Sequence, residues 1–120
     1  MSPLGTAAGD EQVLARLIVG HYQTWGVNKL ARRSEPVYVL RKPNIATLEH
    51  AEGGALNAAA LRSIPTKGRR ATLVTDVDPC DYCGRDGGVN SLAWQLGISE
   101  LEIVSPAGRR FLKVYEPGTL

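Results

Sequence analysis

Apolar residues near the start of the chain recur at helical spacing. Leu14, Leu17 and Ile18 are three and one residues apart, so they share one face of a 3.6-residue period. Asp10 precedes them and has a side chain suited to capping a first helical turn. The pattern predicts a helix over residues 11–25.

Short runs rich in β-branched residues predict strands in the rest of the chain. Two follow the first helix, at residues 27–33 and 36–42, and a more apolar one covers 69–77. The last two, 99–105 and 109–116, are separated by Pro-Ala-Gly. Because a short turn joins antiparallel strands, we expect this last pair to be antiparallel neighbours.

Two further helices are predicted from helix-forming residues. The alanine-rich stretch 50–64 ends before Pro65, and its small side chains indicate close packing on a flat surface. The stretch 79–97 opens with proline, a favoured first helical residue, and holds Trp94, which we expect in the core. The alternation of elements predicts an α/β fold: a three-layer α/β/α sandwich with about five strands in a mixed sheet and helices on both faces.

Length and composition indicate one domain over residues 1–120, with residues 1–9 as a linker. Hydrophobic residues make up 43% of the chain and charged residues 22%, as in ordinary globular domains. No apolar run approaches the roughly 20 residues of a membrane helix, and the start lacks the pattern of a signal peptide. The net charge of +2 says little about partners. Paired arginines are phosphate candidates only as a group: Arg32, Arg33, Arg69, Arg70, Arg109 and Arg110.

The scarcest metal-binding residues stand at the starts of the last two predicted helices. His50 and Glu52 open one, and Cys80 and Cys83 open the other. Residues two apart on a helix point about 200° from each other, so His50 and Glu52 can meet at one site only if they straddle the helix entry. One imidazole and two thiolates leave the fourth tetrahedral position of Zn²⁺ open, as in catalytic sites. Glu52 is then a nearby acid/base and not a ligand.

Each half of this constellation has other uses. A C-x-x-C pair also serves redox chemistry, and a closed zinc knuckle would need a fourth ligand, for which only His21 remains. The combination H-x-E, about 26 residues, then P-C-x-x-C is the known signature of zinc-dependent nucleobase deaminases.

From about residue 25 onward the chain resembles the cytidine deaminase-like superfamily. Its segments "HAEGGALNAAALRSI" and "DPCDYCG", with the compact terminal hairpin, look like the bacterial polymorphic-toxin deaminases, especially the DddA-like DNA cytosine deaminase domains. The resemblance implies that His50, Cys80 and Cys83 bind zinc and that Glu52 shuttles protons. Water activated at the metal would attack C4 of cytosine, and uracil and ammonia would result. No other cofactor is implied.

The resemblance also implies partners and a location. We expect a monomeric effector domain, secreted or injected, that acts on DNA in the cytoplasm of a target cell and is neutralised by an immunity protein. Single strands are slightly favoured over duplexes, and no membrane partner is expected. Two alternatives stay open: a deaminase of RNA or free cytidine, and a non-catalytic binding module stabilised by zinc.

The substrate-binding residues follow from the need to hold a base out of its stack. Tyr82, between the cysteines, is the stacking candidate, or else it packs beneath the helix. Trp25 would line the entrance, or else it lies in the core. Asn44 and Thr47 would hydrogen-bond sugar or phosphate, or else they are turn residues. Ala51, between His50 and Glu52, completes the predicted substrate-binding set.

Overall fold

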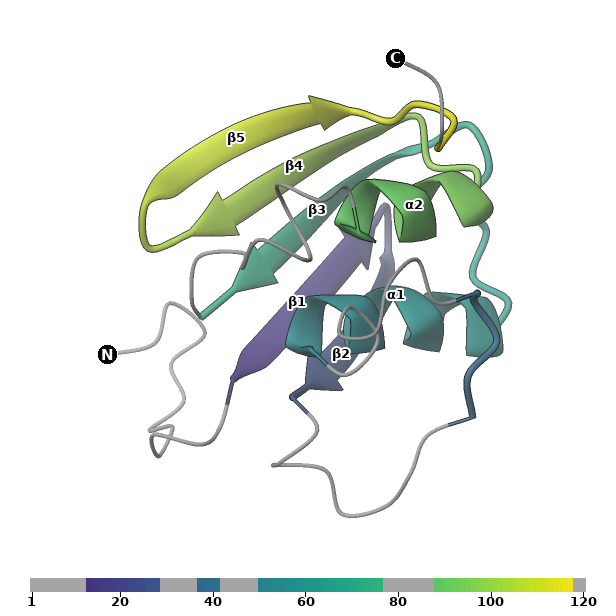
Figure 1. Ribbon diagram of the computed structural model, residues 1–120, viewed down its shortest axis with the longest axis horizontal. Coiled ribbons are helices and arrows are strands. Elements are labelled where there is room, and N and C mark those ends of the chain that lie inside the picture. Colours follow the sequence, from purple (N-terminus) through teal and green to yellow (C-terminus); the bar gives the residue numbers. More distant parts are fainter. Residues whose placement is uncertain (1–12, 29–36, 42–49, 77–87, 118–120) are drawn as a thin grey trace.

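The computed structural model describes residues 13–28, 37–41, 50–76 and 88–117 (Figure 1). These residues form five strands and two helices in one sheet-and-helix unit. The elements are β1 (Leu14–Val19), β2 (Tyr22–Val27), α1 (Ala51–Leu61), β3 (Arg70–Thr75), α2 (Gly88–Gln95), β4 (Glu100–Ser105) and β5 (Gly108–Lys113).

The strands make one mixed sheet in the order β2-β1-β3-β4-β5. Only β3 and β4 pair in parallel, and the other three neighbouring pairs are antiparallel. The predicted α/β class, the five-stranded mixed sheet and the antiparallel last pair are therefore confirmed.

The predicted helix over residues 11–25 is wrong, because this segment forms the β1–β2 hairpin. Ala15, Leu17 and Val19 are buried on one face of β1, and the residues between them are less buried. This is the two-residue period of a strand. Gly20 opens the tight turn with φ of +60°, a conformation that glycine adopts without steric cost.

The predicted strand 36–42 is also wrong where the structure describes it. Residues 37–41 are irregular and are held by the side chain of Asn57 on α1. Its Oδ1 accepts the N–H groups of Val39 (2.7 Å) and Leu40 (3.1 Å), and its Nδ2 donates to the carbonyl of Val37 (2.8 Å). The buried side-chain amide of Asn57 thus supplies hydrogen bonds that a neighbouring strand would otherwise give to this backbone. The other predicted strand, 27–33, lies mostly outside the described residues, and Val27 belongs to β2.

Helix α1 ends four residues before the proline that was expected to stop it. Ser63 adopts a left-handed φ of 54°, and the N–H groups after Leu61 turn back onto the carbonyls of Ala58, Ala59 and Ala60. The predicted start of the next helix, at Pro79, lies outside the described residues, and α2 is described from Gly88.

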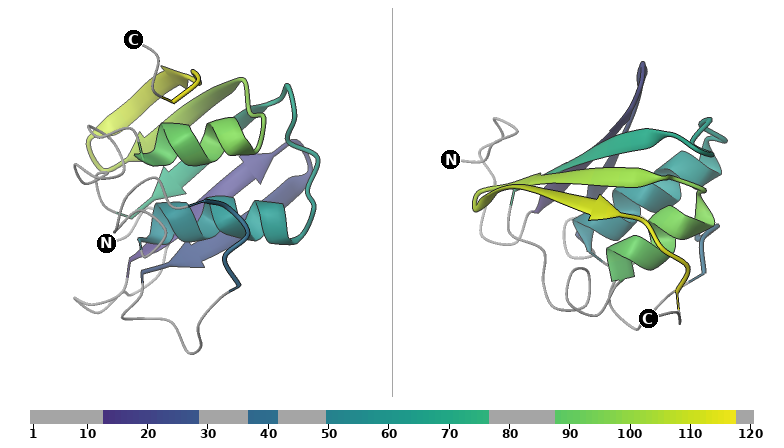
Figure 2. Two further views of the ribbon diagram at one scale, coloured as in Figure 1. Left: turned by 45° about the vertical axis from the view of Figure 1, so that its right-hand side comes forward. Right: turned by 90° about the horizontal axis from the view of Figure 1, so that it is seen from above.

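Both described helices lie on the same face of the sheet (Figure 2). Leucines from both layers fill the core between them, including Leu17, Leu73 and Leu101 from the sheet and Leu56 and Leu92 from the helices. The second helical layer that we expected depended on the helix over residues 11–25. Since that segment is part of the sheet, the described residues leave the opposite sheet face without a helix.

The small side chains of α1 do pack closely against the sheet, as predicted. At Gly26 on β2, an added Cβ would overlap backbone atoms of Ala51, Gly54 and Ala55. The hydroxyl of Thr24 donates to the carbonyl of Ala55 (2.8 Å) from the same strand. Only glycine allows α1 to approach β2 this closely.

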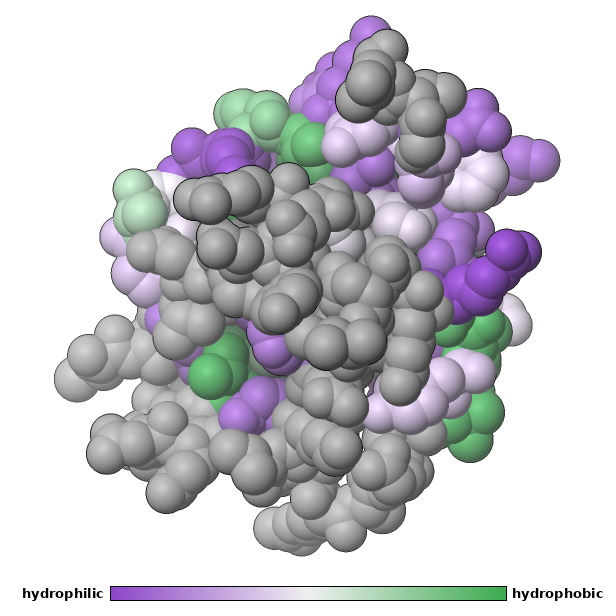
Figure 3. Space-filling view, in the orientation of Figure 1, coloured by the Kyte–Doolittle hydropathy of each residue, from purple (hydrophilic) through white to green (hydrophobic). Residues whose placement is uncertain are grey.

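The described surface mixes hydrophilic residues with small, separate hydrophobic patches on the side shown in Figure 3. No helix among the described residues is long and apolar enough to cross a bilayer.

Candidate active site

The first turn of α1 places His50 and Glu52 at the helix entry. His50 is the N-cap, with extended backbone (φ −85°, ψ 159°), and its carbonyl accepts the N–H of Gly54 (3.0 Å). Its side chain does not cap the helix. Glu52 is the second helical residue. The two residues therefore straddle the entry, which is the geometry that they need to converge on one site.

The carboxylate of Glu52 is almost fully buried, with only 2% of the residue exposed. The hydroxyl of Thr75 donates to its Oε1 over 3.0 Å, and Thr75 is itself completely buried. An isolated buried charge is costly, so such a group needs polar partners. The dipole at the N-terminus of α1 adds to the stabilisation of a negative charge in the first turn.

Thr75 is the last residue of β3, and the end of this strand lies against the first turn of α1. Strands β3 and β4 run parallel, and the N-termini of α1 and α2 lie at the end of the sheet where these strands finish (Figure 1). Asp76 follows and ties this end to β1, since its Oδ2 accepts the N–H of Leu14 (3.1 Å). In open α/β sheets, ligands bind at the carboxyl ends of parallel strands.

The first turn of α1 therefore holds a buried, hydrogen-bonded carboxylate two residues after a histidine, at the end of β3. A family model described as MafB19-like deaminase matches residues 4–115, which is most of the chain. The chain belongs to the MafB19-like deaminase family. This family is cytidine deaminase-like and associated with polymorphic toxins, so the resemblance seen in the sequence is confirmed. No curated protein and no solved structure matches the chain.

Three of the predicted site residues of this deaminase, His50, Ala51 and Glu52, are the N-cap and the first two residues of α1. Ala51 is fully buried at the start of α1. Cys80, Cys83, Tyr82, Asn44 and Thr47 lie outside the described residues. Within the described part of the chain, no three His, Cys, Asp or Glu side chains gather as a metal site. The ligand and substrate roles therefore stay predictions.

Trp25 is not brought to Glu52. It is the cross-strand neighbour of Arg16, on the sheet face away from α1, and the Arg16 guanidinium lies 5.4 Å from the centre of its ring. With 47% of its surface exposed, it is not a core residue either. The prediction of a buried Trp94 is likewise wrong, because 45% of its surface is exposed.

Two of the arginines proposed for phosphate binding have carboxylate neighbours on the same open sheet face. Arg70 lies 3.9 Å from Glu100, and Arg109 lies 3.7 Å from Glu102. These are exposed pairs of small energetic value. They give no reason to assign phosphate binding to either arginine.

Thr75 is the site residue that the sequence did not reveal. A threonine in a β-branched strand is ordinary, and it stands 23 residues from Glu52. Its place at the end of a strand, just before the D-P-C segment, is the one signal that could have drawn attention to it.

Proposed function

We propose that this chain is a zinc-dependent hydrolytic deaminase that converts cytosine to uracil in DNA, with single strands favoured. The observation that carries the proposal is the buried carboxylate of Glu52, which is hydrogen-bonded by Thr75 in the helix turn that His50 opens, in a chain of the MafB19-like deaminase family. A carboxylate fixed by a hydrogen bond at the end of parallel strands is placed where open α/β sheets bind ligands, and a positioned carboxylate can serve as a general acid/base.

The donor set fits zinc. His50 places an imidazole at the helix entry without using it as a cap, and we assign Cys80 and Cys83 as the thiolate ligands. Zinc, when bound, supplies a Lewis acid that makes water a nucleophile at neutral pH.

Glu52 handles the protons of the reaction. We propose that it accepts a proton from the attacking water as the C4–O bond forms, and that it delivers this proton to N3 of the base. It then carries the second proton to the amino group as the C4–N bond breaks, so that cytosine and water give uracil and ammonia. Because Thr75 holds Oε1, we assign both transfers to Oε2.

Uracil formation tests this function directly. The protein is incubated with cytosine in a single-stranded oligodeoxynucleotide, a duplex, an RNA strand and free cytidine, and uracil is measured by mass spectrometry. We expect the highest rate with single-stranded DNA. A higher rate with RNA or cytidine would contradict the DNA assignment, and no uracil from any of the four would contradict cytosine deamination.

Zinc content tests the ligands separately from activity. We expect about one zinc per purified chain, lost in His50→Ala, Cys80→Ser and Cys83→Ser. His21→Ala is the matched control, because His21 is the chain's other histidine and lies exposed in the β1–β2 turn. Equal zinc loss in the control, or full zinc in His50→Ala, would contradict the assignment.

We further propose that the chain acts as a bacterial toxin domain, as a monomer in the cytoplasm of a target cell, and that an immunity protein neutralises it. The family's association with polymorphic toxins supports this. Expression in a bacterial host should be toxic and leave C-to-T changes in its DNA, whereas Glu52→Gln should do neither. Full toxicity of Glu52→Gln with its zinc retained would favour a binding module.

A further inference from the structure

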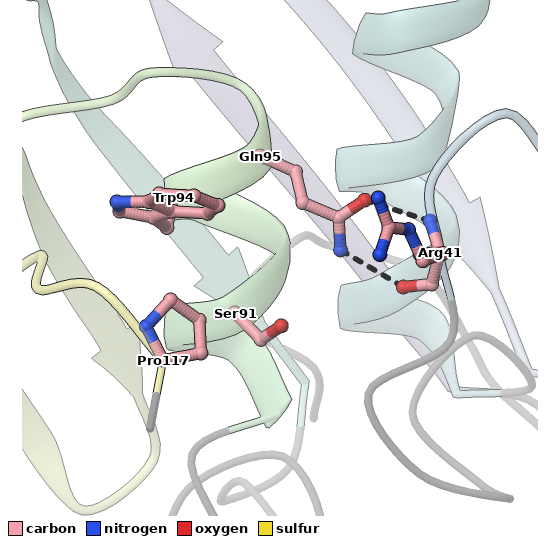
Figure 4. A pocket seen from close by; sticks show the side chains of 5 residues that line it. All are labelled: Arg41, Ser91, Trp94, Gln95 and Pro117. Atoms are coloured by element: carbon pink, nitrogen blue, oxygen red, sulfur yellow. Dashed lines mark hydrogen bonds between the residues drawn. The ribbon is translucent and has the colours of Figure 1, made fainter. Parts of the chain in front are cut away.

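Helix α2 holds two irregular segments of the chain through side-chain amides. Gln95 accepts the N–H of Arg41 at Oε1 (2.7 Å) and donates from Nε2 to its carbonyl (2.9 Å), as Figure 4 shows. Asn90 does the same for Tyr115, with distances of 3.0 and 2.9 Å. Each amide pairs with both peptide groups of one residue, as a neighbouring strand would. Two irregular segments, the residues around Arg41 and those around Tyr115, are thereby held against α2.

A pocket of about 310 Å³ lies between these two segments. Ser91, Trp94 and Gln95 line it from one face of α2, Arg41 comes from one clamped segment, and Pro117 comes from the end of the other (Figure 4). The first segment is also held from α1, where Asn57 binds the backbone of residues 37, 39 and 40. Hydrogen bonds to α2 thus hold Arg41, and also Tyr115, which lies two residues before Pro117.

The lining of the pocket matches a planar, neutral ring joined to a negatively charged group. Trp94 offers a half-exposed indole, Ser91 a hydroxyl, and Arg41 a guanidinium. The lining residues that the structure describes include one positive charge and no negative charge. Aromatic rings stack on bases of any sequence, and guanidinium groups pair with phosphate. The volume is at the small end of ligand pockets, which suits one nucleotide.

Helix α2 links the pocket to the end of the sheet that holds the candidate site. Trp94 is six residues from Gly88, or about 9 Å along α2 at 1.5 Å per residue. The first residues of α1 and α2 lie at the same end of the sheet (Figure 2). A strand whose target base reaches Glu52 can therefore extend along α2.

We propose that this pocket binds a nucleotide of the same strand as the target base, with its base stacked on Trp94 and its phosphate paired with Arg41. The inference rests on the proposed function, because it makes the pocket a second contact for the nucleic-acid substrate. It assigns recognition of the nucleic-acid strand to α2 and to residues 41 and 117, which are not among the proposed catalytic and zinc-binding residues.

The test measures binding without catalysis. In a Glu52→Gln background, affinity for a fluorescein-labelled single-stranded 12-mer is measured by anisotropy. We expect Trp94→Ala to weaken binding about 5- to 150-fold, from the usual contribution of one base–aromatic stack. Arg41→Ala should weaken it several-fold, and Trp94→Phe should retain most of the affinity because it keeps a ring.

Two variants serve as matched controls. Phe111→Ala removes an exposed aromatic ring from β5, and Arg62→Ala removes an exposed cation from the end of α1. Both should bind the 12-mer within twofold of the parent, and thermal unfolding checks that every variant is folded. Equal weakening in the controls, or unchanged affinity in Trp94→Ala, would overturn the proposal. Binding of free dAMP as tight as that of the 12-mer would overturn the assignment to a strand.

The two proposals fail in different ways. If the active protein forms uracil but Trp94→Ala leaves binding and the KM for the oligonucleotide unchanged, the pocket assignment is wrong and the deaminase stands. If no substrate yields uracil but Trp94→Ala still loses the 12-mer, the proposed function is wrong and the nucleotide pocket stands. With both correct, Trp94→Ala should raise the KM for the oligonucleotide and leave that for free cytidine unchanged.

Discussion

Helices α1 and α2 cover the same face of the sheet and begin at the same end of it, but they are built differently. The two helices bury nearly the same share of their residues, seven of eleven in α1 and five of eight in α2. They differ in what they bury and what they expose: the only charged side chain of α1, Glu52, is buried, whereas α2 presents Ser91, Trp94 and Gln95 to a pocket. Small side chains let α1 place a carboxylate inside the protein, whereas larger polar side chains let α2 shape the surface. We accordingly propose that α1 supplies the catalytic carboxylate and that α2 contributes to binding the substrate.

The largest effect should come from Glu52→Gln on α1. We expect kcat to fall about 10²- to 10⁴-fold, the usual contribution of a general acid/base. Stability should change little, because the amide oxygen of glutamine can still accept the hydroxyl of Thr75. Steady-state uracil formation and thermal unfolding measure the two properties. Activity within tenfold of the parent would remove Glu52 from the proposed mechanism.

Gly26→Ala should be the next largest effect, and it tests the close approach of α1 to the sheet. Overpacking of a buried contact costs about 1–3 kcal/mol, and here the obstacle is backbone that cannot rotate away. Urea unfolding measures the loss.

Gly68→Ala is the control for Gly26→Ala. A Cβ added at Gly68 would meet no atom within 4 Å. Only the left-handed φ of +73° disfavours alanine there, and it should lower the free energy of unfolding by about 1–2 kcal/mol. A smaller loss at Gly26 than at Gly68 would contradict the close-packing argument.

Thr75→Val should lower kcat by about tenfold, since it removes a hydrogen bond to a carboxylate while nearly keeping the side-chain shape. Thr75 is a positioning residue, so the test needs a variant that restores only its hydroxyl. Thr75→Ser should recover most of the activity. If Thr75→Ser is as impaired as Thr75→Val, the methyl group matters and the hydroxyl does not.

Gln95→Ala on α2 should have the smallest effect. Losing two exposed hydrogen bonds should cost about 0.5–1.5 kcal/mol and leave the KM for free cytidine unchanged. Hydrogen exchange of the Arg41 amide should become faster, because Gln95 is its acceptor. An unchanged exchange rate of the Arg41 amide would show that residues 37–41 are held in place without the hydrogen bonds of Gln95.

Local residue types were sufficient for much of the chain. The alanine-rich stretch predicted α1 to within a few residues, the apolar run after Arg69 predicted β3, and Pro-Ala-Gly predicted the β4–β5 hairpin. His50 and Glu52 were placed at a helix entry for the same reason, since helix starts depend on nearby residues.

The first segment failed because its residues satisfy two periods. Leu14, Leu17 and Ile18 fit a helix, while Ala15, Leu17 and Val19 fit a strand. Pairing with β3, more than 50 residues away, and the turn at Gly20 decide for the strand. Secondary structure here depends on a partner that a local window does not contain.

What a chain can specify locally is which residues are available at each helix entry, and this was enough to predict the deaminase family and the place of Glu52. The tertiary structure alone decided that Thr75 meets Glu52, that Trp25 lies on the far face, and that Trp94 lines a pocket. The physical reason is that a hydrogen bond, a sheet face and a pocket wall each join segments distant in sequence. Their positions follow from the packing of α1 and α2 on the sheet, and no local pattern records that packing.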